Sequence, residues 1–480
     1  MDARLNTRAS TVLCEIWGRA MKVVSTVGNA AAWILLAASW TSAQEQNPAA
    51  EFSETGDVRA TVKNAWVGYA ENSGAEDSTS SESNANTAAC IAPPPAAFSL
   101  QESFGIHDSQ WFVRGHLQQG ANVNSRRPVN PPGGFGNLPS GGLVYRADEY
   151  MLNQAYVSFG RATDTSHGDF DVGGQVDFMY GTDYVFLSSR GLEKERDGSN
   201  KWNGDHGSGL GGVALQGLAL PQMYAEFAYD TVTVQIGHFY NVFGLEENLP
   251  VKNFYYTIDY TGLYNGYGES DPVTGLFAQW QMSPHWKVGA GLHRGQNKWE
   301  DNNNVLNFVG LVEWTKPSKD MILTYTFDVG AEDDLGQNTV FAQSLIFEWQ
   351  FTEKTSYVLH SSYGFEENVA TGGGTAYWYG FTNYLTHELH KKLLVGMRYG
   401  WFNDVDGTRV FPRAGFPANA PGAYNGLTFG LNYLPHKNVT IRPEVRWDWF
   451  DAHGALPPGP FDGGTNRNQF MAAVDLVISF

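Results

Sequence analysis

From Asp108 to Phe480 the chain alternates apolar and polar side chains at every second position, in segments that end at residues typical of turns. A period of two predicts β-strands with one apolar and one polar face. We predict sixteen strands, at 108–124, 151–161, 169–181, 220–230, 232–243, 275–283, 285–295, 305–314, 320–329, 340–351, 355–365, 375–385, 391–402, 424–435, 437–450 and 468–480. An even number of strands, each with about 10 residues to cross a bilayer, favours an all-β fold, a 16-stranded antiparallel transmembrane β-barrel over residues 108–480.

The connections between these strands fall into two kinds that alternate along the chain. The short ones are 162–168, 231, 284, 315–319, 352–354, 386–390 and 436. The long ones are 125–150, 182–219, 244–274, 296–304, 330–339, 366–374, 403–423 and 451–467. Outer-membrane barrels alternate short periplasmic turns with long external loops, so this order supports the barrel.

The two faces of single segments differ as a barrel wall requires. One face of 437–450 carries Ile441, Val445, Trp447 and Trp449, and the other carries Thr440, Arg442, Glu444, Arg446 and Asp448. Four charges on one face of a membrane strand need an aqueous lumen. A half-buried strand of a secreted soluble sheet shows the same alternation, so that alternative stays open for any single segment.

The last segment ends in an aromatic residue at the carboxyl terminus. Its apolar face carries Phe470, Ala472, Val474, Leu476, Ile478 and Phe480. This pattern resembles the C-terminal signature by which the barrel assembly machinery of bacteria recognises outer-membrane proteins. We expect that machinery to be a partner through the strand that ends at Phe480.

The N-terminal part differs in composition from the strand region. Residues 1–43 have basic residues, a short apolar stretch and small residues before Gln44, which predicts a signal peptide, with Met21 as an alternative start; a single membrane anchor is the other interpretation. Residues 44–107 are acidic and rich in Ser, Asn and Pro, and we expect a mostly disordered linker.

Three short stretches carry a resemblance to a known family. They are Pro221-Gln222-Met223-Tyr224-Ala225-Glu226, the run Gly237-His238-Phe239-Tyr240-Asn241-Val242-Phe243-Gly244, and Asn253-Phe254-Tyr255-Tyr256. Over roughly residues 101 to 480 the chain resembles the OmpL-like putative beta-barrel porin family of Gram-negative-type bacteria, especially its planctomycete-like members. The resemblance implies a barrel in the cell outer membrane with pore activity, and it implies no particular substrate.

Composition and charge exclude several classes of function. The net charge is -19, with 31 basic and 50 acidic residues. The sequence has no cluster of Lys and Arg of the kind that binds nucleic acid, so we expect no nucleic-acid partner. The hydrophobic fraction of 42% is what an average over one lipid face and one aqueous face would give. His387-Glu388-Leu389-His390 is one residue short of a zinc-protease motif and falls in a predicted turn. We expect neither an enzyme nor a bound cofactor or metal.

A barrel of sixteen strands is too wide for wall side chains alone to fill, so we expect a water-filled pore for small hydrophilic solutes and ions. The third long loop, 244–274, is the candidate constriction. It contains the acids Glu246, Glu247, Asp259, Glu269 and Asp271 and the base Lys252. The wall bases expected to face it are Arg114, His116, Arg398, Arg442 and Arg446. Acids opposite bases would create a transverse field, and the acidic excess predicts a weak preference for cations.

Aromatic residues of the same loop leave other interpretations open. Tyr255, Tyr256, Tyr260 and Tyr264 could stack on sugar rings in a substrate-specific channel, or they could pack the loop against the wall. A structural or adhesive barrel whose long loops bind a partner is a further alternative. Outer-membrane lipid would surround the barrel in each case, and a homotrimer is compatible with the sequence.

Overall fold

The computed structural model describes residues 98–106, 110–129, 136–137, 144–166, 168–203, 216–266, 269–410, 421–453 and 459–480. The helices in this part are short: α3 (Leu100–Ser103), α4 (Tyr184–Leu187), the 3-10 helix η1 (Pro250–Lys252) and α5 (Tyr260–Tyr264). The strands are β1 (Trp111–Asn124), β2 (Tyr150–Arg161), β3 (Phe170–Gly181), β4 (Gly217–Ala219), β5 (Met223–Tyr229), β6 (Val232–Tyr240), β7 (Pro272–Ser283), β8 (Trp286–Gln296), β9 (Asn307–Thr315), β10 (Met321–Ala331), β11 (Thr339–Thr352), β12 (Thr355–Ala370), β13 (Gly374–His390), β14 (Leu393–Asp404), β15 (Gly422–His436), β16 (Val439–Ala452) and β17 (Asn468–Ser479).

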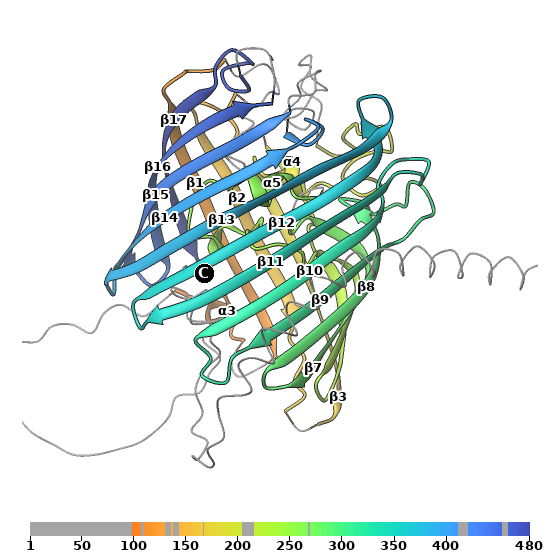
Figure 1. The fold of residues 1–480 in the computed structure, drawn as a ribbon. Helices are drawn as coiled ribbons and strands as arrows, with labels where there is room; N and C mark the ends of the chain where they lie inside the picture. The colour runs from red at the N-terminus through yellow and green to blue at the C-terminus, as the bar shows by residue number, and fades with distance from the viewer. Residues whose placement is uncertain are drawn as a thin grey trace, which may run out of the picture. The chain divides into compact units, whose positions relative to one another are not determined.

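These strands close into one antiparallel barrel (Figure 1). Strand β1 pairs with β2 on one side and with β17 on the other, so the sheet has no free edge at this seam. Both β4 and β5 pair with β3, and only residues 220–222 separate them, so they form one interrupted wall strand. The prediction of sixteen wall strands is therefore confirmed.

The carboxyl terminus completes the seam between the first and last strands. The amide of Gly115 donates to the carbonyl of Phe480 at 2.7 Å, and the amide of Phe480 donates back to Gly115 at 2.9 Å. A Cβ on Gly115 would lie 2.6 Å from the Phe480 ring, so the ring covers this glycine. The aromatic terminus that the sequence singled out is thus part of barrel closure.

The two faces of β17 show how the alternation is used. Phe470 and Val474 point outward and are 48% and 41% exposed, which is the position of lipid-facing side chains. Their neighbours Met471, Asp475 and Val477 point inward and are buried. One face of the strand meets lipid and the other meets the barrel interior. The alternation of the sequence therefore explains both the exposed apolar side chains and the buried polar ones.

The turns agree with the predicted alternation, with two differences at strand ends. The short connections lie at one end of the barrel, and several contain only two residues, such as 230–231 and 353–354. The expected long loop 366–374 is instead a three-residue turn, because β12 and β13 extend beyond the predicted ends and remain paired. For the same reason 387–390 is not a turn but the end of β13, with His387 opposite Thr355.

The segment before the barrel is described only from residue 98. The predicted signal peptide and most of the predicted linker lie outside the described residues and stay predictions. The amide of Phe98 donates to the side chain of Asn438 at 3.0 Å, and Asn438 donates to the Phe98 carbonyl at 2.8 Å. These bonds hold α3 and its flanks at the end of the barrel that carries the short turns. Within the described ranges, no helix has the length and apolarity to span a membrane.

Candidate functional site

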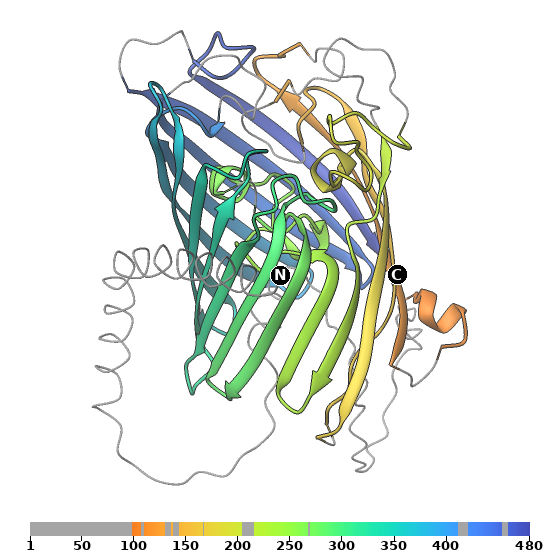
Figure 2. The same cartoon turned by 90° about the vertical axis from the view of Figure 1, so that its right-hand side faces the viewer.

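The connection between β6 and β7, residues 241–271 and here called L3, lies inside the ring of strands (Figure 2). It is shifted from the expected 244–274 because β6 ends at Tyr240 and β7 begins at Pro272. Its described residues contain η1 and α5. Side chains of L3 join buried apolar clusters with inward-facing residues of β2 and β11 to β17, so the loop has a packed interface with this part of the wall.

Three wall arginines hold the backbone of L3. Arg398 on β14 donates to the Thr257 carbonyl at 2.7 Å. Arg442 on β16 donates to the carbonyls of Pro250 and Asn253 at 2.7 and 2.6 Å, and Arg446 donates to Ile258 at 2.7 Å. All three arginines are at most 3% exposed. Since loop carbonyls inside a barrel lack strand partners, these donors satisfy acceptors that would otherwise be buried alone.

Charged partners complete the bonding of each arginine. The Arg398 guanidinium lies 2.6 Å from the Glu246 carboxylate of L3 and 4.6 Å from the centre of the Tyr255 ring. Burial raises the pKa of the Glu246 carboxyl, and the Arg398 charge opposes that rise. Arg442 pairs with Asp475 and Arg446 with Asp448, both inward-facing residues of the wall. Buried pairs such as these are costly to break singly, because the remaining charge has no water.

Glycines on β14 leave room for the loop to approach the wall. A Cβ on Gly400 would lie 2.2 Å from Asp259 Oδ2, and one on Gly396 would lie 2.5 Å from the Phe254 ring. Asp259 is the N-cap of α5, accepting from the amide of Thr261 at 3.4 Å, and its other donor is the Thr382 hydroxyl at 2.6 Å. The absence of side chains at these two positions is therefore what lets L3 lie directly against β14.

The other candidate charges of L3 are also paired within the described structure. Glu247 and Lys252 form an ion pair at 2.8 Å on the more exposed side of the loop. Glu269 lies 3.0 Å from His360 on β12 and accepts from the amide of Leu245. Asp271 accepts from the side chain of Asn297 at 2.8 Å. None of these acids, nor Glu246 or Asp259, is more than partly accessible.

The four tyrosines of the loop are buried against the wall. Tyr255 packs with Val358 and Leu394, and Tyr256 donates from its hydroxyl to Asn153 at 2.7 Å. Tyr260 and Tyr264 belong to a cluster with wall residues of β11 and β13 to β16. Packing of the loop against the wall was one of the two interpretations of these tyrosines that the sequence allowed. A role for these rings in contacting a solute stays a prediction, and it would require the rings to be uncovered.

The arrangement of loop acids and wall bases differs from the one expected for a transverse field, in which the two sets would face each other across water. Arg398, Arg442 and Arg446 contact L3 or its immediate neighbours instead of facing it across water. Arg114 lies apart from them on β1, exposed, with its guanidinium 4.7 Å from the Phe112 ring. His116 is buried and bonds Gln154 at 3.1 Å. Contact strengthens the Coulomb attraction of each pair, and the hydrogen bonds from the arginines to loop carbonyls help to offset the cost of removing these charges from water.

Sequence alternation missed the apolar residues that point inward. Val358, Tyr384 and Leu394 occupy inward positions and pack against Leu245, Phe254 and Tyr255 of L3. Their signal is weak, because an apolar residue on the polar face of a strand is an ordinary irregularity. The position of L3 explains the apolar core on this side of the barrel interior.

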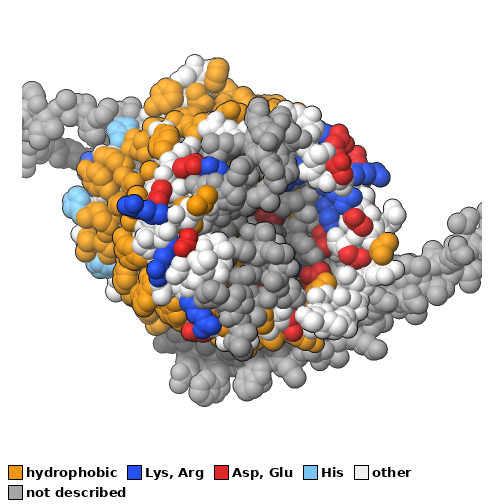
Figure 3. Space-filling model, turned by 90° about the horizontal axis from the view of Figure 1, so that it is seen from above, with side chains coloured by type: hydrophobic (Ala, Val, Ile, Leu, Met, Phe, Trp, Pro, Cys, Tyr) orange, Lys and Arg blue, Asp and Glu red, His pale blue; other side chains and the backbone are white. Residues whose placement is uncertain are grey.

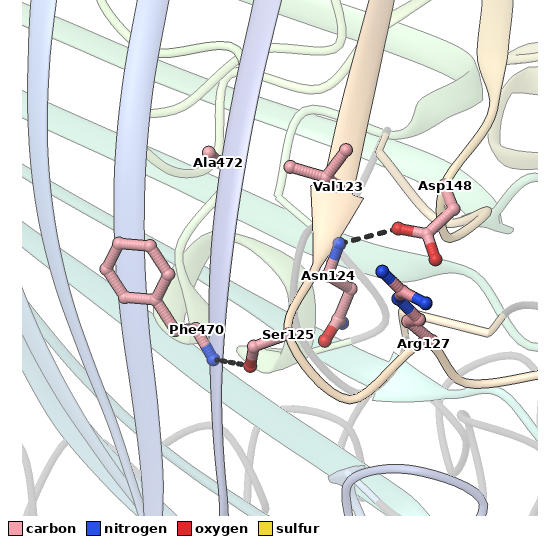
Figure 4. Close-up of a pocket in the computed structure, with 7 residues that line it drawn as sticks. All are labelled: Val123, Asn124, Ser125, Arg127, Asp148, Phe470 and Ala472. Atoms are coloured by element: carbon pink, nitrogen blue, oxygen red, sulfur yellow. Dashed lines mark hydrogen bonds between the residues drawn. The ribbon is translucent and has the colours of Figure 1, made fainter.

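Charged side chains surround the hollow seen from the long-loop end (Figure 3). Two buried pairs lie near this end, Lys298 with Glu332 at 2.5 Å and His293 with Asp328 at 2.9 Å. A separate hollow of about 530 Å³ lies at the outer rim between the ends of β1 and β17 (Figure 4). Its lining includes Val123, which is 62% exposed, so it opens toward the lipid side. No group of three or more His, Cys, Asp or Glu among the described residues is arranged to hold a metal.

Comparison with known proteins places this architecture. The profile of the family described as "Putative beta-barrel porin-2, OmpL-like" matches residues 112–480. The anion-selective porin from Comamonas acidovorans is similar in structure, with a TM-score of 0.51 and 8% identity over 78% of this chain and 100% of that one. The outer membrane channel DcaP of Acinetobacter baumannii gives a TM-score of 0.49 with 12% identity, over 80% of this chain and 100% of that one. OmpT of Vibrio cholerae gives 0.47 with 9% identity, over 77% and 97%. No curated protein has a significantly similar sequence.

Proposed function

The chain belongs to the OmpL-like family of putative beta-barrel porins, so it is a porin-like barrel of the outer membrane, and we propose that L3 is the constriction of its pore. Small hydrophilic solutes and ions would pass by diffusion between L3 and the part of the wall that it leaves free. One observation carries this proposal: L3 is fixed inside the barrel by Arg398, Arg442 and Arg446. A loop held by buried bonds narrows the lumen permanently, whereas a mobile loop would not.

A weak preference for cations is part of the proposal. L3 has five acids and a single base in its sequence, and the wall arginines it contacts are already shared with Asp475 and Asp448. Excess negative charge close to a narrow aqueous path raises the local concentration of cations. The anion selectivity of the Comamonas porin is a property of that protein. At 8% sequence identity the two chains share a similar fold, and this similarity does not predict the ion selectivity of this chain.

Single-channel recording in planar bilayers tests the function directly. In a gradient of KCl we expect a reversal potential of the sign that reports K⁺ permeating faster than Cl⁻. A reversal potential of the opposite sign would refute the cation preference and leave the pore intact. Absence of conductance from correctly folded barrel would refute the pore and favour the structural or adhesive alternative.

Assembly remains a matter of prediction. We propose that the barrel assembly machinery recognises the strand that ends at Phe480. This proposal is supported by the outward apolar face of the strand and by its aromatic terminus, both of which are part of the seam with β1. A homotrimer is also proposed, and crosslinking of the protein in native outer membranes tests it by the mass of the product.

A further inference from the structure

We infer that, at the end of the barrel that carries the short turns, solutes pass along the wall formed by β3 and β5 to β9, and that Glu226 on this wall is the main determinant of cation preference. This inference rests on the proposed pore function and specifies where its selectivity resides. The charges of L3, which are mostly paired, would then shape the constriction and add to the cation preference, and Glu226 would supply the larger part of it.

L3 leaves one side of the lumen less covered than the other. Its contacts with β11 to β17 bury the inward side chains there: Ser362, Thr382 and Arg398 are at most 3% exposed. On the opposite side, the inward positions of β3, β5, β6 and β7 nearer the short turns are only half-buried, including Gln175, Glu226, Gln235 and Gln279. Water therefore has access to the short-turn end of the second wall and little access to the first. Nearer the long loops the second wall is also buried, by an apolar cluster that includes Phe239, Phe277 and Val309.

These half-buried residues form a polar patch, which the buried ring of Phe277, opposite Gln235 on β7, interrupts. Glu226 lies opposite Gln235 across β5 and β6, and Gln279 lies opposite Thr233 across β6 and β7. They face the lumen, because Ile236 on the other face of β6 is 45% exposed on the lipid side. Amide and carboxylate groups in register across strands offer hydrogen bonds to passing water and to the hydration shells of ions.

Most charges on this wall are neutralised by a neighbour. Arg161 pairs with Asp171 at 2.8 Å, and Lys287 pairs with Glu313 at 2.9 Å. The hydrogen-bond donors to Glu226 within the described structure are neutral: the Thr163 hydroxyl at 2.6 Å and the Gln235 amide at 3.1 Å.

The surroundings of Glu226 leave its charge largely uncompensated. Asp177, a second acid of this wall, is fully buried and bonds Tyr156, Gln175 and Gln222. Two bases lie on this side. Arg161 is opposite Gly174, next to the Gly173 that pairs with Glu226, and Arg114 lies two strands from Asp177 in register, which is about 10 Å at ordinary strand spacing. Arg161 is already paired with Asp171, and the exposed Arg114 weakens the field of Glu226 through water without cancelling it. A half-buried carboxylate held by neutral donors is thus the group that a cation on this path would meet.

Thiol accessibility tests the path separately from conductance. Cys90 is the single cysteine after the predicted signal peptide, so Cys90→Ala gives a background without thiols. On that background we expect Gln235→Cys and Gln279→Cys to react with a cationic methanethiosulfonate at least tenfold faster than Ser362→Cys, measured by mass shift in folded barrel. Ser362 is the matched control because it points inward on the wall beside L3, is 3% exposed, and differs from Cys by one atom. Equal rates at the three positions would overturn the assigned path.

Reversal potentials test the role of Glu226. We expect Glu226→Gln to move the reversal potential in a KCl gradient toward zero by at least half, with conductance within twofold of the parent. Glu353→Gln removes the same charge from an exposed turn outside the lumen and should leave the reversal potential unchanged. A parent-like potential in Glu226→Gln refutes the inference, as does an equal shift in both variants. If no variant conducts, the pore proposal fails, while the thiol rates still report which wall is open.

Discussion

A methyl group added at Gly400 should release L3 from the wall. In Gly400→Ala the new Cβ would lie 2.2 Å from Asp259 Oδ2 and 2.4 Å from Oδ1, well inside contact distance. The strand cannot move away, because both of its neighbours bond it along its whole length. Asp259 must therefore leave, together with its bond from Thr382 at 2.6 Å and the N-cap of α5.

The magnitude follows from the two lost interactions. A hydrogen bond to a charged group contributes about 1.5–3 kcal/mol. An N-cap contributes about 0.5–2 kcal/mol. Together they amount to roughly 2–5 kcal/mol, and since about 1.4 kcal/mol corresponds to a factor of ten, the fraction of barrels with L3 displaced should rise by about 30-fold or more.

The displacement of L3 can be measured by trypsin cleavage and by single-channel recording in bilayers. Lys252 is the only Lys or Arg in L3, so cleavage after it reports the released loop. We expect Gly400→Ala to be cut faster at Lys252 and to show noisier single-channel current than the parent. The control is Gly374→Ala, whose Cβ would meet only the Ala370 side chain at 3.8 Å. If Gly400→Ala matched Gly374→Ala in both measurements, the reasoning that Gly400 seats the loop would be wrong.

Two further predictions concern the arginine contacts and the seam. Arg398→Met should lower the midpoint of thermal unfolding by an amount equivalent to about 3–5 kcal/mol, because Glu246 is left charged and buried. Adding Glu246→Gln to this variant should restore most of the lost stability. A double variant as unstable as Arg398→Met would contradict the ion-pair role. Deletion of Phe480 should lower the yield of heat-modifiable folded barrel on a gel, because both backbone bonds to Gly115 are lost; Phe104→Ala, at an exposed position outside the barrel, is the control, and equal yields would show that the terminus is dispensable for closure.

Local pattern was enough to predict the wall. The faces of 437–450 and of the last strand are occupied as the alternation indicates, because each strand residue has only two directions in which to point. The order of short and long connections predicted closure with all strands antiparallel. Strand ends were less well predicted: β12 and β13 run past the membrane-spanning length, and extra pairing beyond the bilayer has no distinct apolar signal.

The candidate site shows where pattern stops. The sequence identified L3, its acids and Arg398, Arg442 and Arg446, but it predicted that acids and bases would face each other across water. Whether an inward charge meets solvent or a loop depends on contacts between residues more than 100 positions apart, such as Arg398 with Glu246. No local periodicity records such contacts.

The sequence by itself thus determined a barrel with an apolar outside and a polar inside, because lipid and water act on each strand residue separately. Only the tertiary structure decided which part of that polar inside is covered. Glycines such as Gly400 and the three arginines let L3 pack on one wall, and the chain that fills this side leaves Glu226 and its amide neighbours on the other. The physical reason is that close packing and buried ion pairs depend on distances between distant segments, which become defined only when the barrel closes.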